Sequence, residues 1–203
     1  APSAVPYDKD WNVPRALDDA GLAEVKGQFV AAAERAARAG YAVAELHAAH
    51  GYLLHQFLSP IANQRNDGYG GDLDGRMRFP LEVFAAVRAV WPSERPLGVR
   101  VSATDWVDGG WTVEETVVFA QALKAMDCDF IDVSSGGMDP RQEIPLGPGY
   151  QVHLAEQVGQ ASGMPAMAVG MITNGRQAEA IVAQGQADMV ALARGMLFDP
   201  HWT

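Results

Sequence analysis

Five short apolar runs are spaced along the chain, each bounded by glycine, proline or polar residues. A continuous apolar run of this length is typical of a strand that is buried on both faces of a parallel sheet. We therefore predict five buried strands, at residues 41–48, 96–102, 129–135, 165–170 and 187–194.

Longer segments with apolar residues at helical spacing alternate with these runs. The first, residues 22–39, precedes the first predicted strand and ends before Gly40, a residue that commonly stops a helix. The others lie between successive strands, at residues 73–90, 112–126, 151–160 and 175–184. Strands that alternate with helices indicate a parallel sheet with right-handed crossovers.

Two parallel architectures fit this alternation. A doubly wound sheet places a glycine-rich phosphate loop after its first strand, but here HAAHGY follows that strand. A (β/α)₈ TIM barrel spreads functional residues over the carboxyl ends of many strands. Polar or small residues stand at such ends here, namely His47, Arg100, Ser134, Gly170 and Arg194. We predict the α/β class and a single partial TIM barrel over residues 1–203, with five of eight strands.

Composition narrows the functional classes. A formal net charge of −10 argues against binding to nucleic acid or an anionic membrane. The chain has no apolar run of about 18 residues, the length that a membrane-spanning helix needs. Cys128 is the only cysteine, which excludes a disulfide framework and fits a reducing, cytoplasmic location. The start, APSAVPY, lacks both an initiator Met and a signal-peptide pattern, so we expect a piece of a longer protein.

The segment ELHAAHGYLLHQFLSP contains three of the five histidines. His47 and His50 stand three residues apart at a strand end, without carboxylate or cysteine ligands at a suitable spacing, so no metal site is predicted. A neutral imidazole pair that donates hydrogen bonds to a substrate oxygen suits this position better, with Tyr52 alongside. Two structural histidines remain the alternative. His55 lies in the apolar run LLHQFL, where we predict a structural role.

Arg100 stands in the apolar strand LGVRV, where an unpaired charge would be very costly. One interpretation is a salt bridge to Glu45 or Asp132. The other is a cation that faces an electron-rich cofactor ring. The spacing alone does not decide between them.

The last two strands lead into loops of the kind that bind phosphate. In barrels, the loops after strands 7 and 8 and a helix N-terminus often form such a site. Gly170 would permit close approach of the backbone, and Arg194 offers several donors. A glycine there could also be only a strand-end turn, but the two features together favour a phosphate site.

The polar segment 59–79 is long for a loop between a strand and a helix. It carries arginines 65, 76 and 78 and aspartates 67, 72 and 74. Loops of this length are usually functional or disordered. We predict an ordered cap that pairs its own charges and supports the site.

The segment ELHAAHGYLLHQFLSPIANQRNDGYGGDLDGRMRFPLEV resembles the central signature of the old yellow enzyme family of FMN-dependent ene-reductases. PLGVRVSATDW, DFIDVSSGG, PGYQVHLAEQV, AVGMITNG and ADMVALARGMLFDP resemble the later strands of that family in the right order. The similarity covers nearly the whole chain. HAAH and PGYQV are most similar to the bacterial thermophilic-like branch, whereas the other well-known branch has His and Asn at the two histidine positions.

The resemblance implies a role for each candidate residue. His47 and His50 would bind the carbonyl or nitro oxygen of an activated alkene, and Tyr52 would be the proton donor. Arg100 would lie beside the N1/O2 edge of the flavin. The FMN phosphate would be held by the backbone around Gly170, Met171, Ala193 and Arg194 and by the Arg194 side chain.

The resemblance also implies a ping-pong reaction in which NADPH or NADH reduces FMN and the alkene then takes up hydride. The full-length form is expected to be a homo-oligomer. Because the first strands of the family lie outside the chain, we expect the isolated polypeptide to hold FMN weakly. The alternatives are an iron–sulfur relative, such as a 2,4-dienoyl-CoA reductase or an amine dehydrogenase, and an inactive barrel fragment.

Overall fold

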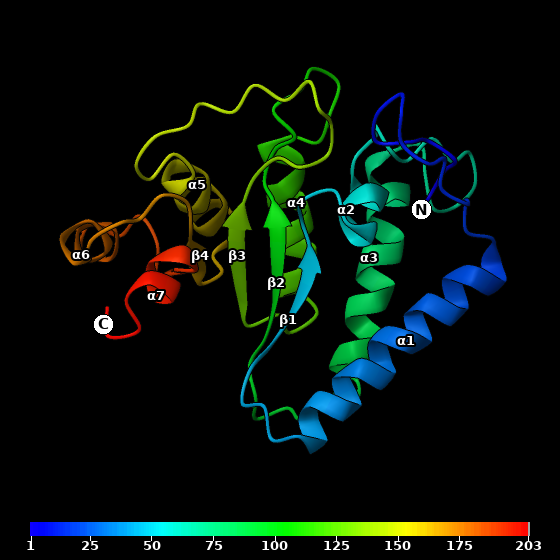
Figure 1. Cartoon of the computed structure of the whole chain (residues 1–203). Coiled ribbons are helices and arrows are strands. Elements are labelled where there is room, and N and C mark those ends of the chain that lie inside the picture. The colour runs from blue at the N-terminus through cyan, green and yellow to red at the C-terminus, as the bar shows by residue number, and fades with distance from the viewer. Residues whose placement is uncertain (203) are drawn as a thin grey trace.

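The structure is a computed structural model that describes residues 1–202, and its centre is one sheet of five parallel strands (Figure 1). Each strand bonds to the next one in chain order. An uninterrupted order of parallel strands is that of a barrel wall, so the predicted partial (β/α)₈ barrel is confirmed. The strands are β1 (Ala44–Ala48), β2 (Leu97–Ser102), β3 (Phe130–Ser134), β4 (Ala166–Ala168) and β5 (Met189–Val190).

Helices cover one side of this sheet and leave its other side open to view (Figure 1). Helix α1 packs on α3, and α5 packs on both β3 and β4. The helices are α1 (Asp19–Arg38), α2 (Leu53–Leu58), α3 (Leu73–Arg88), α4 (Val113–Lys124), α5 (Val152–Ser162), α6 (Gly175–Ala183) and α7 (Arg194–Phe198). No helix within residues 1–202 has both the length and the apolar character needed to cross a bilayer.

All five predicted strands and all five predicted helices are present, with ends shifted by a few residues. Helices α2 and α7 were not predicted, because six and five residues are too few to show a helical period. The expectation that every strand is buried on both faces is wrong for β1, where the Glu45 side chain is exposed. Glu45 lies on the inner face of the sheet, which no helix covers.

The hydrophobic core lies between the sheet and its helices. Leu46 and Ala48 of β1 face this layer and are buried. Phe57 of α2 and Phe79 of α3 contact each other there, with ring centroids 4.5 Å apart. On the inner face the Phe130 ring fills the space over Gly98, where a Cβ atom would lie 2.3 Å from that ring.

The segment between α2 and α3 is ordered by its own polar groups, as predicted. Arg65 Nη2 lies 2.5 Å from Asp67 Oδ2, and the Asp72 side chain caps α3 by accepting from the Gly75 N–H at 2.9 Å. Arg76 departs from the expected pairing because it forms its ion pair with Glu115 of α4. Its guanidinium also donates to Leu58 O and Gly71 O, each at 2.9 Å.

Replacing Arg76 with Met should destabilise the fold by about 3 kcal/mol, because it leaves Glu115 and two carbonyl groups without their donor. Arg78→Met is the matched control, since Arg78 is exposed and, within residues 1–202, donates only to Gly68 O. The cost of this substitution should stay below about 1 kcal/mol. Urea unfolding of both variants measures the difference. Equal losses would show that Arg76 does not hold the cap onto α4.

Candidate functional site

Three of the predicted site residues meet where β1 ends. His47 is the penultimate residue of β1, His50 lies in the loop that follows, and Tyr52 caps the start of α2. The His47 ring centroid lies 5.2 Å from that of His50 and 5.3 Å from that of Tyr52. Both histidines are half-buried, whereas the Tyr52 side chain is 64% exposed. The strand end therefore presents two imidazoles and a phenol to one region.

The backbone at His50 is fixed in an uncommon conformation. His50 has φ +56°, in the left-handed region that histidine, asparagine and aspartate enter more readily than most residues. Its N–H donates to Ser102 Oγ at 2.9 Å, and the Ser102 hydroxyl donates to Gly136 O at 2.8 Å. The end of β2 thus holds the loop that carries the histidine.

Two glycines allow this loop to pack against the loop after β3. Gly51 has φ +75° and Gly137 has φ +94°. A Cβ atom on Gly51 would lie 2.2 Å from Gly137 O, and one on Gly137 would lie 2.6 Å from His50 Cα. Neither position can carry a side chain without moving the backbone of the facing loop.

His55 supports the same loop from below, which confirms its predicted structural role. Its Nδ1 accepts from the Gly51 N–H at 3.0 Å. Its Nε2 lies 2.9 Å from Asp105 Oδ1, a close contact that is not aligned as a hydrogen bond, and both side chains are fully buried. Asp105 Oδ2 accepts from the Ser59 hydroxyl at 2.6 Å and the Trp111 N–H at 2.8 Å.

Residues without a predicted role hold the His50 side chain. His50 Nε2 lies 2.6 Å from Ser134 Oγ at the end of β3. Ser134 is also close to Gln151, which directly precedes α5, receives the Ser135 hydroxyl at 2.6 Å and donates to Val169 O at 2.9 Å. Ser134 was noticed only as a strand-end residue, and no local pattern marked Gln151 beyond its place in PGYQV.

Arg100 lies beside His47, because the two residues pair in register on adjacent strands. Its Nε is 3.2 Å from Asp132 Oδ2 on β3, so of the two carboxylates considered the partner is Asp132. Within residues 1–202 the terminal nitrogens of Arg100 have no ion-pair partner, and 27% of the side chain is exposed. The salt bridge therefore leaves these nitrogens available, and both interpretations of Arg100 are compatible.

Two carboxyl groups on the inner face of the sheet have raised pKa values. Burial raises the pKa of Asp132 to about 6 against the opposing effect of Arg100. The Glu45 side chain is reached by solvent from the open face but still has protein on several sides; this partial burial, with the nearby Asp132, raises its pKa to about 7.

The pKa values of the two histidines are lowered instead. Burial, with Arg100, His47 and His55 nearby, lowers the pKa of His50 to about 4. Burial and Arg100 also lower the pKa of His47. Both imidazoles are therefore neutral at pH 7, and each carries a single N–H.

The predicted phosphate-binding residues lie at the same edge of the sheet, beyond β4 and β5. Gly170 (φ +116°) and Met171 (φ +50°) follow β4, and a Cβ atom on Gly170 would lie 2.6 Å from Gln151 Nε2. Ala193 and Arg194 are exposed at the start of α7. Because Ala168 pairs with Val190, the two strand ends are neighbours. The phosphate site itself stays a prediction.

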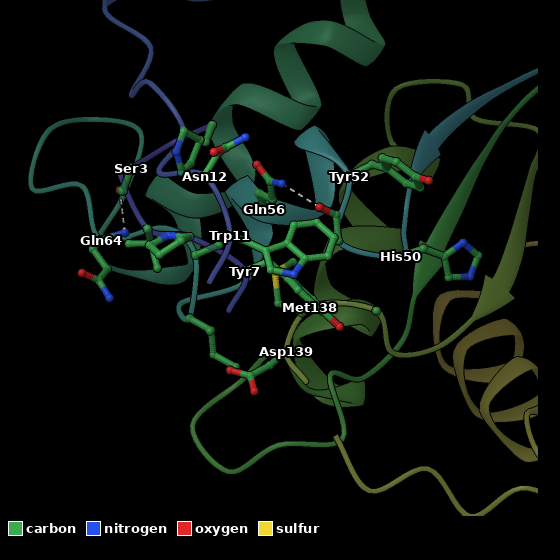
Figure 2. Close-up of a pocket in the computed structure, with 18 of the residues that line it drawn as sticks. Ser3, Tyr7, Trp11, Asn12, His50, Tyr52, Gln56, Gln64, Met138 and Asp139 are labelled. Carbon is green, nitrogen blue, oxygen red and sulfur yellow. Dashed lines mark hydrogen bonds between the residues drawn. The ribbon is translucent and has the colours of Figure 1, made fainter. Parts of the chain in front are cut away.

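A cavity of about 810 Å³ borders the loop after β1. Residues 1–14 line much of it, together with the loop after β1 and residues 137–141. Figure 2 shows the His50 and Tyr52 rings extending away from Trp11 and Gln56, which lie on the cavity side. His50 and Tyr52 are among the residues that line this cavity, so the cavity adjoins the end of β1. Within residues 1–202, no three His, Cys, Asp or Glu side chains form a metal-binding group.

Gly137→Ala should lower the free energy of unfolding by roughly 1–3 kcal/mol, because alanine is strained at positive φ and would collide with His50. Gly147→Ala is the control, since a Cβ atom there meets nothing within 4 Å. Thermal or urea unfolding measures both variants. A Gly137 variant as stable as the Gly147 variant would contradict the close loop contact.

Comparison with known proteins places this geometry in a family. The profile of the NADH:flavin oxidoreductase / NADH oxidase family matches residues 2–203. NADPH dehydrogenases of Listeria innocua and Geobacillus thermodenitrificans are each 44% identical over 202 residues, which is 100% of this chain. The chain spans 59% and 58% of the length of those two relatives.

Solved structures agree with this assignment. A 2-naphthoyl-CoA reductase in complex with 2-naphthoyl-CoA has a TM-score of 0.91 and 28% identity, with coverage of 98% of this chain and 31% of that one. Histamine dehydrogenase from Rhizobium sp. 4-9 has a TM-score of 0.84 and 31% identity, with coverage of 98% and 30%. Morphinone reductase in complex with tetrahydroNAD has a TM-score of 0.81 and 27% identity, with coverage of 100% of this chain and 57% of that one. The chain therefore belongs to the NADH:flavin oxidoreductase / NADH oxidase family, to which the old yellow enzymes belong.

Proposed function

We propose that the protein is an FMN-dependent ene-reductase that uses NADPH or NADH to reduce the C=C bond of activated alkenes. The observation that carries this proposal is the cluster of His47, His50 and Tyr52 at the end of β1, with Arg100 beside His47. Two neutral N–H donors and one phenol are the groups that such a substrate requires. The substrates are α,β-unsaturated carbonyl or nitro compounds.

The residues of the inner face fit FMN. Arg100 lies between His47 and Asp132 on the inner face, and its terminal nitrogens remain available to contact the electron-rich edge of a flavin. The loops after β4 and β5 put Gly170, Met171, Ala193 and Arg194 at the carboxyl edge, where they would hold the phosphate. When bound there, FMN would supply the hydride-transfer chemistry between the nicotinamide and the β-carbon of the alkene.

The side chains around His47 would act on the other end of the alkene. Hydrogen bonds from His47 and His50 to the substrate oxygen would stabilise the negative charge that develops there as the β-carbon is reduced. Because both imidazoles are neutral, each has one N–H with which to donate. The exposed Tyr52 hydroxyl would give a proton to the α-carbon. Uncharged donors of this kind keep their role over a broad range of pH.

A second candidate is a reductase of CoA thioesters or an amine dehydrogenase of the iron–sulfur type. It is supported by the likeness to 2-naphthoyl-CoA reductase and to histamine dehydrogenase. The 44% identity to NADPH dehydrogenases and the HAAH pair favour the first candidate. Iron analysis of the purified protein, together with assays on an aryl-CoA thioester and on histamine, distinguishes the two.

The visible spectrum of the purified full-length protein tests the proposal. We expect a flavin band that NADPH bleaches under anaerobic conditions and that cyclohexenone restores. Failure of cyclohexenone, and of a nitroalkene, to reoxidise the reduced protein would rule out the ene-reductase. Tightly bound iron with turnover of a CoA thioester would favour the second candidate.

Tyr52→Phe should slow reoxidation by cyclohexenone by roughly 10²- to 10⁴-fold, the usual contribution of a general acid. Reduction by NADPH should keep its rate, because that step uses no proton from Tyr52. Tyr41→Phe is a matched control, since Tyr41 is also 64% exposed but lies before β1. Stopped-flow absorbance measures both half-reactions. An unchanged rate of reoxidation in Tyr52→Phe would remove Tyr52 from the mechanism.

The lowered pKa of His50 predicts how stability depends on pH. Between pH 6.5 and about 4 the unfolded chain binds a proton at His50 that the folded chain does not, so this residue makes stability fall as the pH drops through that range. Asn at position 50 tolerates positive φ and does not titrate. His50→Asn should therefore lose less stability between pH 7 and pH 5 than the wild type.

Urea unfolding at the two pH values measures this difference. His153→Asn, which removes an exposed histidine of α5, should behave as the wild type does. Glu45 and Asp132 shift in the opposite sense but are present in every variant, so they cancel in the comparison. If the stability of His50→Asn depended on pH as that of the wild type does, His50 would be as easily protonated in the folded chain as in the unfolded one.

A further inference from the structure

The two nitrogens of the His50 ring stand in different surroundings. Nε2 lies 2.6 Å from the hydroxyl of Ser134, a side chain that is 4% exposed. Nδ1 has no hydrogen-bond partner within residues 1–202, so it is the nitrogen left for a ligand. Because the imidazole is neutral, only one of the two nitrogens can carry a proton. Which one does so decides whether His50 offers a donor or a lone pair.

The surrounding hydrogen bonds determine where the Ser134 proton goes. Gln151 is 1% exposed, and its Nε2 donates to Val169 O at 2.9 Å, which orients its Oε1 toward the serines. That Oε1 already receives the Ser135 hydroxyl at 2.6 Å, while Ser134 Oγ is 3.4 Å away, beyond the normal range for an O–H donor. The nearer acceptor for the Ser134 proton is His50 Nε2.

From this geometry we infer that Ser134 is a positioning residue that fixes the tautomer of His50. The Ser134 hydroxyl donates to Nε2, which keeps the ring proton on Nδ1. His50 then presents Nδ1–H toward the region shared with His47 and Tyr52. The part that names a substrate oxygen as the acceptor rests on the proposed function; the assignment of the tautomer does not.

The arrangement has a clear consequence for catalysis. An imidazole whose Nε2 loses its donor can move the proton to that nitrogen, and Nδ1 then becomes an acceptor. Such a ring repels the oxygen that it should bind. Ser134 acts from β3, 84 residues away in sequence from the histidine that it orients. It does not itself touch the substrate in this proposal.

Nuclear magnetic resonance of the protein labelled with nitrogen-15 histidine tests the tautomer without any substrate. Two-bond proton–nitrogen correlations distinguish a protonated Nδ1 from a protonated Nε2, and loss of a signal in His50→Gln identifies His50 among the five histidines. We expect the wild type to show Nδ1–H at pH 7. A wild-type signal for Nε2–H would overturn the inference, whatever the variants do.

Ser134→Ala should shift His50 toward the Nε2–H form, whereas Ser134→Thr, which keeps the hydroxyl, should retain Nδ1–H. Ser162→Ala is the matched control, because Ser162 is a buried serine whose hydroxyl donates to Val158 O and takes no part in the contacts of His50. An unchanged tautomer in a folded Ser134→Ala variant would also refute the role. If Ser134→Ala does not fold, the His50 tautomer measured in the wild type and in Ser134→Thr still tests the inference.

Turnover provides a second measurement. Loss of an oxyanion donor typically lowers kcat by 10²–10³-fold, so a partly wrong tautomer in Ser134→Ala should lower kcat for cyclohexenone by about tenfold. Ser134→Thr should restore most of the activity. If the protein reduces no activated alkene, the proposed function fails while the tautomer measurement still tests Ser134. If it reduces alkenes but His50 carries Nε2–H, only this inference fails.

Discussion

The register of three adjacent parallel strands is the constraint on which the site depends. Partners in a parallel ladder point to the same face of the sheet, so His47, Arg100 and Asp132 form one inward row. Ser102 and Ser134 form the next row toward the carboxyl edge. The first row brings the cation to the histidine, and the second meets the loop that carries His50. A shift of one residue in any of these strands would turn its row toward the helices.

The loop after β1 is held from two sides, although it contains no regular structure until α2. From the side of β3, the backbone of Gly137 fits against Gly51 where no side chain could lie. From the core, His55 receives the Gly51 N–H and contacts Asp105. The close fit of the two glycines and the hydrogen bond from Gly51 to His55 fix the path of this loop. The ring of His50 therefore has a defined place before any ligand arrives.

The sequence predicted the fold, and it singled out the candidate residues at the end of β1, but it gave no sign of the contacts that hold them in place. Apolar runs located every strand because burial on a parallel sheet is a local property of composition. The histidine pair was apparent because two such residues at one strand end are unusual. Ser134 and Gln151 gave no such signal, since a serine that ends a buried strand looks the same whether or not it orients a histidine. The exposure of Glu45 was not predicted, because an apolar run does not show which face of a sheet is left uncovered by helices.

The positive φ of His50 limits how this position can change in evolution. Among residues other than glycine, asparagine, aspartate and histidine enter the left-handed region most readily. Aspartate offers no donor when it is ionised, and glycine has no side chain, so only histidine and asparagine satisfy both the backbone and the need to donate a hydrogen bond. A single backbone torsion thus restricts the substitutions at this position that would keep the hydrogen bond proposed for His50.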